Sequence, residues 1–129
     1  MMDLMHKVTS PWTAPALNPA PVEYYEKISR AIDFAFRSRQ LIRVGEAARL
    51  SGLRPKAFSA AFHRLTGLGF PQFALRCRLH GAADHIRTTG LPLKAIAGNW
   101  GFTDHSHFYH DFMSHYGCSP QRYRERSRP

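Results

Sequence analysis

One pattern occurs twice along this chain, and no other feature of the sequence restricts the possible folds as strongly. The second copy, residues 91–124, places Gly101 between two stretches in which apolar residues recur at helical spacing. In the earlier copy, residues 44–73, Gly52 takes the place of Gly101 at an offset of 49 residues, and the offset becomes 50 after the glycine. Internal duplication of this kind predicts two similar helical units in tandem.

Each copy is expected to form a helix-turn-helix in which the longer helix follows the glycine. These longer helices are predicted for residues 55–66 and 104–116, because a proline opens the first and Gly117 can end the second. Either Thr103 or Asp104 can cap the later helix, since a side-chain oxygen accepts an otherwise unpaired N–H of the first turn.

The polar faces of these two helices indicate a function. A polar helix held on a small core can enter the major groove of DNA, where the base edges display their full pattern of donors and acceptors. An ordinary pair of packed helices would show the same spacing in a single copy. The repetition favours DNA recognition, because it supplies two candidate recognition helices in one chain.

The segment between the copies, residues 71–88, has the apolar spacing of a helix and is followed by a glycine and a proline that would end it. A helix of this length would span about 27 Å, of the order needed to set two recognition helices about one DNA turn, ~34 Å, apart. A core helix that merely connects two bundles would show the same pattern.

The segment before the first copy, residues 22–39, has an amphipathic pattern with Ile28, Ile32, Ala35 and Phe36 on one face. This helix is expected to brace the first helix-turn-helix. The sequence therefore predicts an all-α fold with two helix-turn-helix subdomains joined by a long linker helix. The expected domains are a flexible proline-rich leader or linker (1–21), the first subdomain (22–70), the linker helix (71–90) and the second subdomain with a basic tail (91–129).

The charge of the chain favours a polyanionic partner. Lysine and arginine number 18 against 9 acidic residues, which gives a net charge of +9 with neutral histidines. Such an excess favours nucleic acid through the release of counterions, although charge alone does not distinguish DNA from RNA, heparin or anionic lipid. No signal peptide or membrane-spanning run is present, so a cytoplasmic location is expected. Cys77 and Cys118 are interpreted as small packing residues.

The second copy resembles a known family. Its residues Ile96-Ala97, Gly101-Phe102, Asp104, Ser106, Phe108, Phe112, Gly117, Pro120 and Tyr123-Arg124 are similar to the C-terminal helix-turn-helix of the AraC/XylS family of bacterial transcription regulators. Residues Arg78-Leu79, Ala82 and Ile86 resemble the linker helix of that family, and Ser51-Gly52, Phe62 and Gly67 its first helix-turn-helix. The resemblance covers roughly residues 22–126.

The resemblance implies a homeodomain-like tandem of about seven helices that binds double-stranded DNA as a monomer. Its two recognition helices would lie in adjacent segments of the major groove, and regulation would act through contact with RNA polymerase or by occlusion. The short members of the family, which lack a sensor domain, are the expected relatives. Neither a cofactor, a metal nor a small-molecule effector is expected within this chain, and the location would be the cytoplasm, at the nucleoid.

Carried over by position, the resemblance and the polar helix faces together nominate two sets of DNA contacts. The candidate base readers are Lys56, Ser59 and Arg54 of the first copy and His105, Ser106, His107 and His110 of the second. The candidate phosphate contacts are Arg43, Arg64, Arg76, Lys94 and Thr103. Three positions depart from the pattern, since the family usually has arginine where Ala60 and His110 stand, and lysine where Met113 stands.

Two other classes of function remain open from the sequence. Four of the eight histidines lie between His105 and His115, so a metal-dependent nuclease or a cysteine-based DNA repair enzyme can be considered. Against an enzyme, Phe108 and Phe112 occupy the core face of the histidine-rich helix and no paired carboxylates accompany the histidines. The other alternative is a nonspecific nucleoid-type protein or a protein adaptor, which the missing arginines favour.

Overall fold

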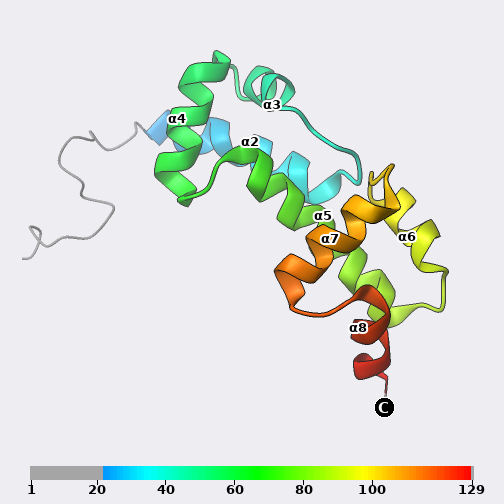
Figure 1. The fold of residues 1–129 in the computed structure, drawn as a ribbon. Coiled ribbons are helices and arrows are strands. Elements are labelled where there is room, and N and C mark those ends of the chain that lie inside the picture. Colours follow the sequence, from blue (N-terminus) through cyan, green and yellow to red (C-terminus); the bar gives the residue numbers. More distant parts are fainter. Residues whose placement is uncertain (1–21, 129) are drawn as a thin grey trace, which may run out of the picture. The chain divides into compact units, whose positions relative to one another are not determined.

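The computed structural model describes residues 22–128, a range that forms helices and connecting turns without a strand. The proline-rich segment of residues 1–21 lies outside the described residues. None of the described helices is both long enough and apolar enough to cross a membrane. The seven described helices are α2 (Val22–Arg37), α3 (Val44–Leu50), α4 (Pro55–Thr66), α5 (Phe70–Thr88), α6 (Leu93–Asn99), α7 (His105–Tyr116) and α8 (Pro120–Ser127) (Figure 1). The all-α prediction is thus confirmed.

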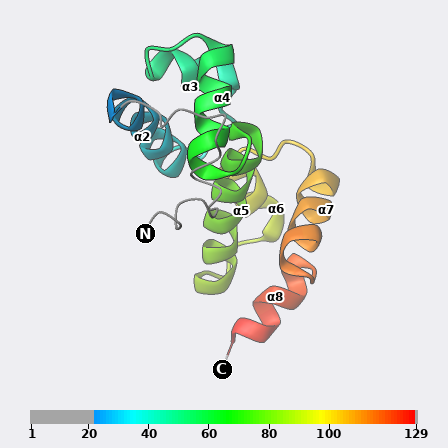
Figure 2. The same ribbon diagram turned by 90° about the vertical axis from the view of Figure 1, so that its left-hand side faces the viewer.

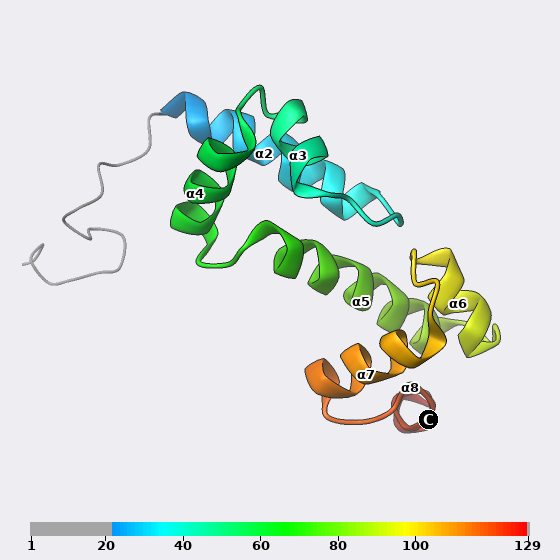
Figure 3. The same cartoon turned by 45° about the horizontal axis from the view of Figure 1, so that its top comes forward.

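The described chain divides into two compact units, each of which is considered by itself. The first consists of residues 22–34 and 43–71, and the second of residues 35–42 and 72–128. Helices α2 and α5 therefore each contribute residues to both units. Figure 3 shows α5 as one uninterrupted helix, as predicted for the segment between the two copies.

The duplicated sequence produces the same turn in both units. In the first unit the Leu53 N–H donates to the carbonyl five residues earlier at 2.9 Å, and in the second the Phe102 N–H does so at 3.0 Å. The glycine before each donor has a positive φ, 70° for Gly52 and 84° for Gly101. This left-handed conformation is why each turn needs a glycine.

The second helices of the two helix-turn-helices, α4 and α7, end in the same way and begin differently. Gly67 and Gly117 have φ angles of 79° and 76°, and each N–H donates to a carbonyl in the last turn of its helix at 2.8 Å. These C-caps end α4 and α7 at the predicted residues. Helix α7 begins one residue later than expected because Asp104 serves as its N-cap, whereas Arg54 at the corresponding position of α4 makes no side-chain cap.

The core of the first unit is built on three aromatic rings. Phe58 and Phe62 of α4 and Phe70 of α5 are almost fully buried, with ring centroids 5.3–5.6 Å apart. Ala47 and Ala48 of α3 are fully buried, which lets α3 lie close to α4 (Figure 2). Packing of this kind fixes the orientation of α4 and leaves its opposite face to solvent.

The core of the second unit joins α5, α6 and α7. Its buried residues are Leu79, Ala82, Ala83, Ile86, Ile96, Ala97, Phe102, Phe108 and Phe112. Phe108 and Phe112 are fully buried, and Tyr116 packs against Phe112 with ring centroids 4.5 Å apart. The predicted core face of α7 is therefore confirmed, and α7 turns its remaining faces outward.

A buried cation supports the turn of the second helix-turn-helix. Arg78 of α5 is only 8% exposed, and its guanidinium donates to the carbonyls of Trp100 and Gly101 at 3.4 and 3.2 Å. It also lies over the Phe102 ring, 4.4 Å from the centroid. Burial lowers the pKa of the Arg78 guanidinium, while the negative charge of Asp111 acts in the opposite direction. Arg78 thus binds the turn to α5.

A second arginine shows that part of the predicted basic tail is packed against the rest of the second unit. Arg124 of α8 donates through Nε to the Ile86 carbonyl at 3.1 Å and through Nη2 to the Leu91 carbonyl at 2.7 Å. The Ile86 carbonyl lies in the last turn of α5, where carbonyls lack a helical partner. Arg124 therefore fastens α8 to the end of α5 and to the loop before α6.

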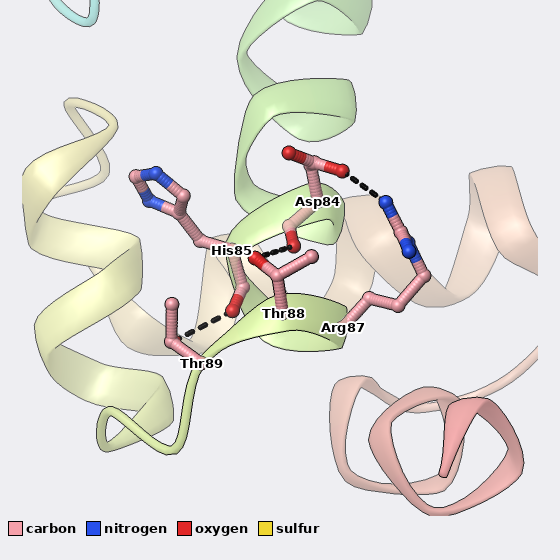
Figure 4. A network of polar contacts seen from close by, with 5 residues as sticks. All are labelled: Asp84, His85, Arg87, Thr88 and Thr89. Atoms are coloured by element: carbon pink, nitrogen blue, oxygen red, sulfur yellow. Dashed lines mark hydrogen bonds and ion pairs between the residues drawn. The ribbon is translucent and has the colours of Figure 1, made fainter. Parts of the chain in front are cut away.

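Polar contacts also stabilise the C-terminal end of α5 (Figure 4). The Thr88 and Thr89 hydroxyls donate to the carbonyls of Asp84 and His85, each at 2.7 Å, and Arg87 pairs with the Asp84 carboxylate at the surface. Nδ1 of His85 also accepts a hydrogen bond from the indole N–H of Trp100 at 3.1 Å. This hydrogen bond attaches Trp100, the C-cap residue of α6, to α5.

The first helix differs from its sequence prediction in two respects. It ends at Arg37 instead of continuing to Arg39. Phe36, predicted on the buried face, is 61% exposed, and the buried residues of α2 are Ile28, Ala31 and Ala35. The buried stripe thus follows the spacing i, i+3, i+7, which leaves Phe36 on a neighbouring face with its ring edge-on to Phe73.

Candidate nucleic-acid interface

The candidate readers of the first unit lie on the solvent face of α4. Lys56 and Ser59 are exposed and follow the exposed Arg54, which occupies the N-cap position. All three lie within the first turns of the helix, while the core face is held by Phe58 and Phe62. Cationic and hydroxyl groups at the N-terminal end of an exposed helix can contact base edges and phosphates.

The start of α7 is held by a charged cap. Oδ1 of Asp104 accepts hydrogen bonds from the Ser106 and His107 backbone N–H groups at 2.8 and 3.2 Å. These hydrogen bonds, first that from His107, lower the pKa of the Asp104 carboxyl, and the neighbouring histidines add to the effect. The cap is therefore ionised at neutral pH and fixes the first turn, which carries the candidate readers.

Three of the four predicted readers of α7 share one surface hollow. His105, Ser106 and His110 line it together with Tyr109 and Met113. His107 does not line this hollow, and its Nδ1 lies 3.9 Å from the Asp104 carboxylate. The structure thus groups His105, Ser106 and His110 on one face and sets His107 apart from them.

The predicted phosphate contacts are distributed over both units. In the second unit Lys94 and His105 line a common hollow with residues of α8 and its C-cap, where Arg128 adds a cation and Glu125 an opposing carboxylate. Thr103 and Arg76 are exposed. In the first unit Arg43 is exposed at the N-cap of α3, whereas Arg64 is half-buried in the last turn of α4.

Sequence reasoning did not nominate the other residues of this surface. Tyr109 and Met113 of α7 line a further hollow with Arg122 and Arg126 of α8. The spacing of His105, Tyr109 and Met113, four residues apart, could have indicated a shared helix face. The approach of α8 to that face could not, because it depends on the tertiary contacts of Arg124.

The described residues offer little for the chemistry of the enzymatic alternatives. Cys118 is buried, and burial raises the pKa of the Cys77 thiol, so neither cysteine has the environment of a reactive thiolate. Within residues 22–128 no three His, Cys, Asp or Glu side chains are grouped closely enough to hold a metal ion.

The comparison with known families agrees with this geometry. A helix-turn-helix domain family matches residues 47–126, a range that contains both glycine turns. The chain belongs to the AraC-type helix-turn-helix family. Regulatory protein PocR of Salmonella typhimurium (strain LT2) is 30% identical to this AraC-type domain over 107 residues, 81% of this chain and 35% of PocR. The chain spans between 23% and 35% of the length of the curated relatives it matches.

Solved structures share the fold of this AraC-type domain. A transcriptional regulator of the AraC type from Chromobacterium violaceum superposes with a TM-score of 0.75 at 18% identity, covering 83% of this chain and 96% of that one. The DNA-binding domain of AdpA, a global transcriptional factor solved in complex with a target DNA, gives a TM-score of 0.73 at 22% identity. That match covers 77% of this chain and 90% of the AdpA domain. The tandem helix-turn-helix fold predicted from the sequence is therefore confirmed.

Proposed function

We propose that this AraC-type domain binds specific double-stranded DNA sequences and regulates transcription. The observation that carries the proposal is the pair of equivalent helix-turn-helices, each with a buried aromatic face and an exposed polar face on its second helix. The net charge of +9 supplies the electrostatic attraction that DNA binding requires. The AdpA domain, which was solved with its target DNA, supports the same reading of the fold.

In this proposal α4 and α7 enter adjacent segments of the major groove. Lys56, Ser59 and Arg54 read bases through α4, and His105, Ser106 and His110 through α7, with His107 at the rim near Asp104. The phosphate contacts are Arg43, Arg64, Arg76, Lys94 and Thr103. Regulation follows from contact with RNA polymerase or from occlusion of a promoter, without an effector bound to this domain and at the nucleoid of the cytoplasm.

The direct test is selection of bound fragments from a random pool of DNA duplexes. The expected result is one asymmetric motif with two parts, because two different recognition helices contact it. Specific DNA should be bound at least about 10³ times more tightly than random DNA at the same salt concentration. A smaller ratio would favour the nonspecific nucleoid-type or adaptor function. The absence of lysine and arginine from α7 is the observation that favours this alternative.

Substitutions should separate base readers from phosphate contacts. Lys56→Ala should weaken binding to the selected motif by roughly 1–3 kcal/mol and relax the preference at one part of it only. Lys94→Ala should weaken binding to all sequences and reduce the slope of log K against log salt by about one. The affinity of each variant for selected and for random duplexes is measured by titration at several salt concentrations. Equal losses on both duplexes for Lys56→Ala would refute its assignment as a reader.

The histidines proposed to read bases through α7 can be tested by substitution. His105 and His110 are exposed on the face proposed to meet DNA. The double variant His105→Ala, His110→Ala should relax the preference at the part of the site that α7 contacts, whereas His80→Ala, an exposed histidine of α5, should keep the wild-type preference. Selection of bound duplexes with each variant makes the comparison, and an unchanged motif for the double variant would contradict the assignment.

A further inference from the structure

The second recognition helix lacks the side chains that most often read guanine. The sequence of α7, HSHFYHDFMSHY, contains neither lysine nor arginine, whereas α4 contains Lys56 and Arg64. Guanine is usually read by the long donors of these cations at its O6 and N7 atoms. The base preference of α7 therefore cannot rest on guanine contacts of lysine or arginine.

The exposed face of α7 has an apolar ridge formed by Tyr109 and Met113. These two large side chains are 43% and 40% exposed, and their spacing of four residues places them one above the other on the helix. Both line the hollow that contains His105 and His110. A pair of exposed apolar side chains on this face can contact an apolar group of a ligand.

The cations beside the ridge indicate which ligand this is. Tyr109 and Met113 also line a second hollow, which contains Arg122 and Arg126 of α8. An apolar centre with cations beside it complements the major groove of DNA, where the thymine C5-methyl is the apolar group of the base edges and phosphates lie along both rims.

We propose that Tyr109 and Met113 are specificity-determining residues that contact thymine methyl groups, so that α7 selects a thymine-containing part of the DNA site. The inference rests on the proposed function and deepens it. Side chains four residues apart on a helix are separated by about 6 Å along its axis, compared with ~3.4 Å between successive base pairs. The ridge therefore spans about two base steps, and α7 contacts two thymines in neighbouring or next-neighbouring base pairs.

The experiment replaces thymine by deoxyuridine, which removes the methyl group and leaves every hydrogen-bonding atom in place. A site is first selected from random duplexes with the full chain. Each thymine in the half that does not respond to Lys56→Ala is then replaced. The affinity of the wild-type protein should fall about fourfold for each contacted methyl group. Replacement of thymines in the other half provides the matched DNA control.

Protein variants identify the side chains that make the contact. The double variant Tyr109→Ala, Met113→Ala should bind the thymine site more weakly and should no longer distinguish thymine from deoxyuridine. Ser114→Ala, an exposed residue of α7 that lines neither hollow, should retain the wild-type response. Circular dichroism of the double variant checks that α7 is still folded.

The possible outcomes separate this inference from the proposed function. A selected site whose affinity is unchanged by deoxyuridine, or a double variant with wild-type affinity, overturns the inference and leaves sequence-specific binding intact; the ridge would then be open to a protein partner. Failure to select any motif, with equal affinity for all duplexes, overturns the proposed function instead. The thymine contacts are supported if the double variant loses the deoxyuridine response while the wild-type protein and Ser114→Ala keep it.

Discussion

Gly101→Ala is expected to be among the most destabilising single substitutions in the chain. A Cβ atom at this position would lie 2.8 Å from the Arg39 carbonyl oxygen and 3.2 Å from the Leu41 nitrogen, both of them backbone atoms. The φ of 84° adds the cost of a left-handed conformation for alanine, about 1–2 kcal/mol. Together with the overlap between the Cβ atom and these backbone atoms, this cost should lower the free energy of unfolding by roughly 3 kcal/mol or more. Thermal or denaturant unfolding measures the change.

The duplicated turn supplies a matched control for this prediction. Gly52 has a similar φ of 70°, yet a Cβ atom there would meet nothing within 4 Å. Gly52→Ala should therefore cost only about 1–2 kcal/mol, the conformational part of the effect. If both variants unfold at the same temperature, the segment that contains Arg39 and Leu41 does not pack against the second turn, and the account of Gly101 given above is wrong.

Arg78→Ala should be similarly harmful, for a different reason. The substitution leaves the carbonyls of Trp100 and Gly101 without their donor and removes the group stacked on Phe102. Breaking a buried charged contact of this kind costs about 3 kcal/mol. For a domain of this size the melting temperature should fall by roughly 10–20 °C. The DNA binding proposed for α7 should weaken as well, since the turn that orients α7 is lost.

Two further variants of α5 test the explanation. Arg87→Ala removes an exposed arginine of the same helix whose partner is Asp84, and it should cost less than about 1 kcal/mol. Arg78→Lys keeps the positive charge, but an ammonium group cannot donate to two carbonyls in the fixed geometry of a guanidinium and stack on a ring as well. It should therefore restore only part of the stability. Full restoration by lysine would show that charge, and not this geometry, is what matters.

Local patterns in the sequence predicted the helix-turn-helices well. The bounds of α4 follow from a proline at the first helical position and from Gly67, and Asp104 is one of the two caps predicted for α7. Both signals act within a few residues of the helix ends, so they can be read from the chain directly. The core face of α7 was visible for the same reason, because Phe108 and Phe112 are one turn apart.

Features that depend on distant contacts were not visible. Arg124 was grouped with the basic tail because its partners, Ile86 and Leu91, are 38 and 33 residues away in the sequence. Phe36 was assigned to the core because large apolar residues dominate a hydrophobic pattern, whereas the buried stripe of α2 includes the small Ala31 and Ala35. The pairing of the α7 ridge with arginines of α8 likewise requires the position of α8, which no local pattern supplies.

The interleaving of the two units along the chain bears on the order of biosynthetic folding. Every residue assigned to the first unit precedes residue 72, so that unit is synthesised before most of the second. Residues 35–42, by contrast, leave the ribosome long before the turn at Gly101 against which they pack. A polypeptide that started at residue 72 would lack these residues. A fragment made of the C-terminal half alone would therefore be an incomplete second unit.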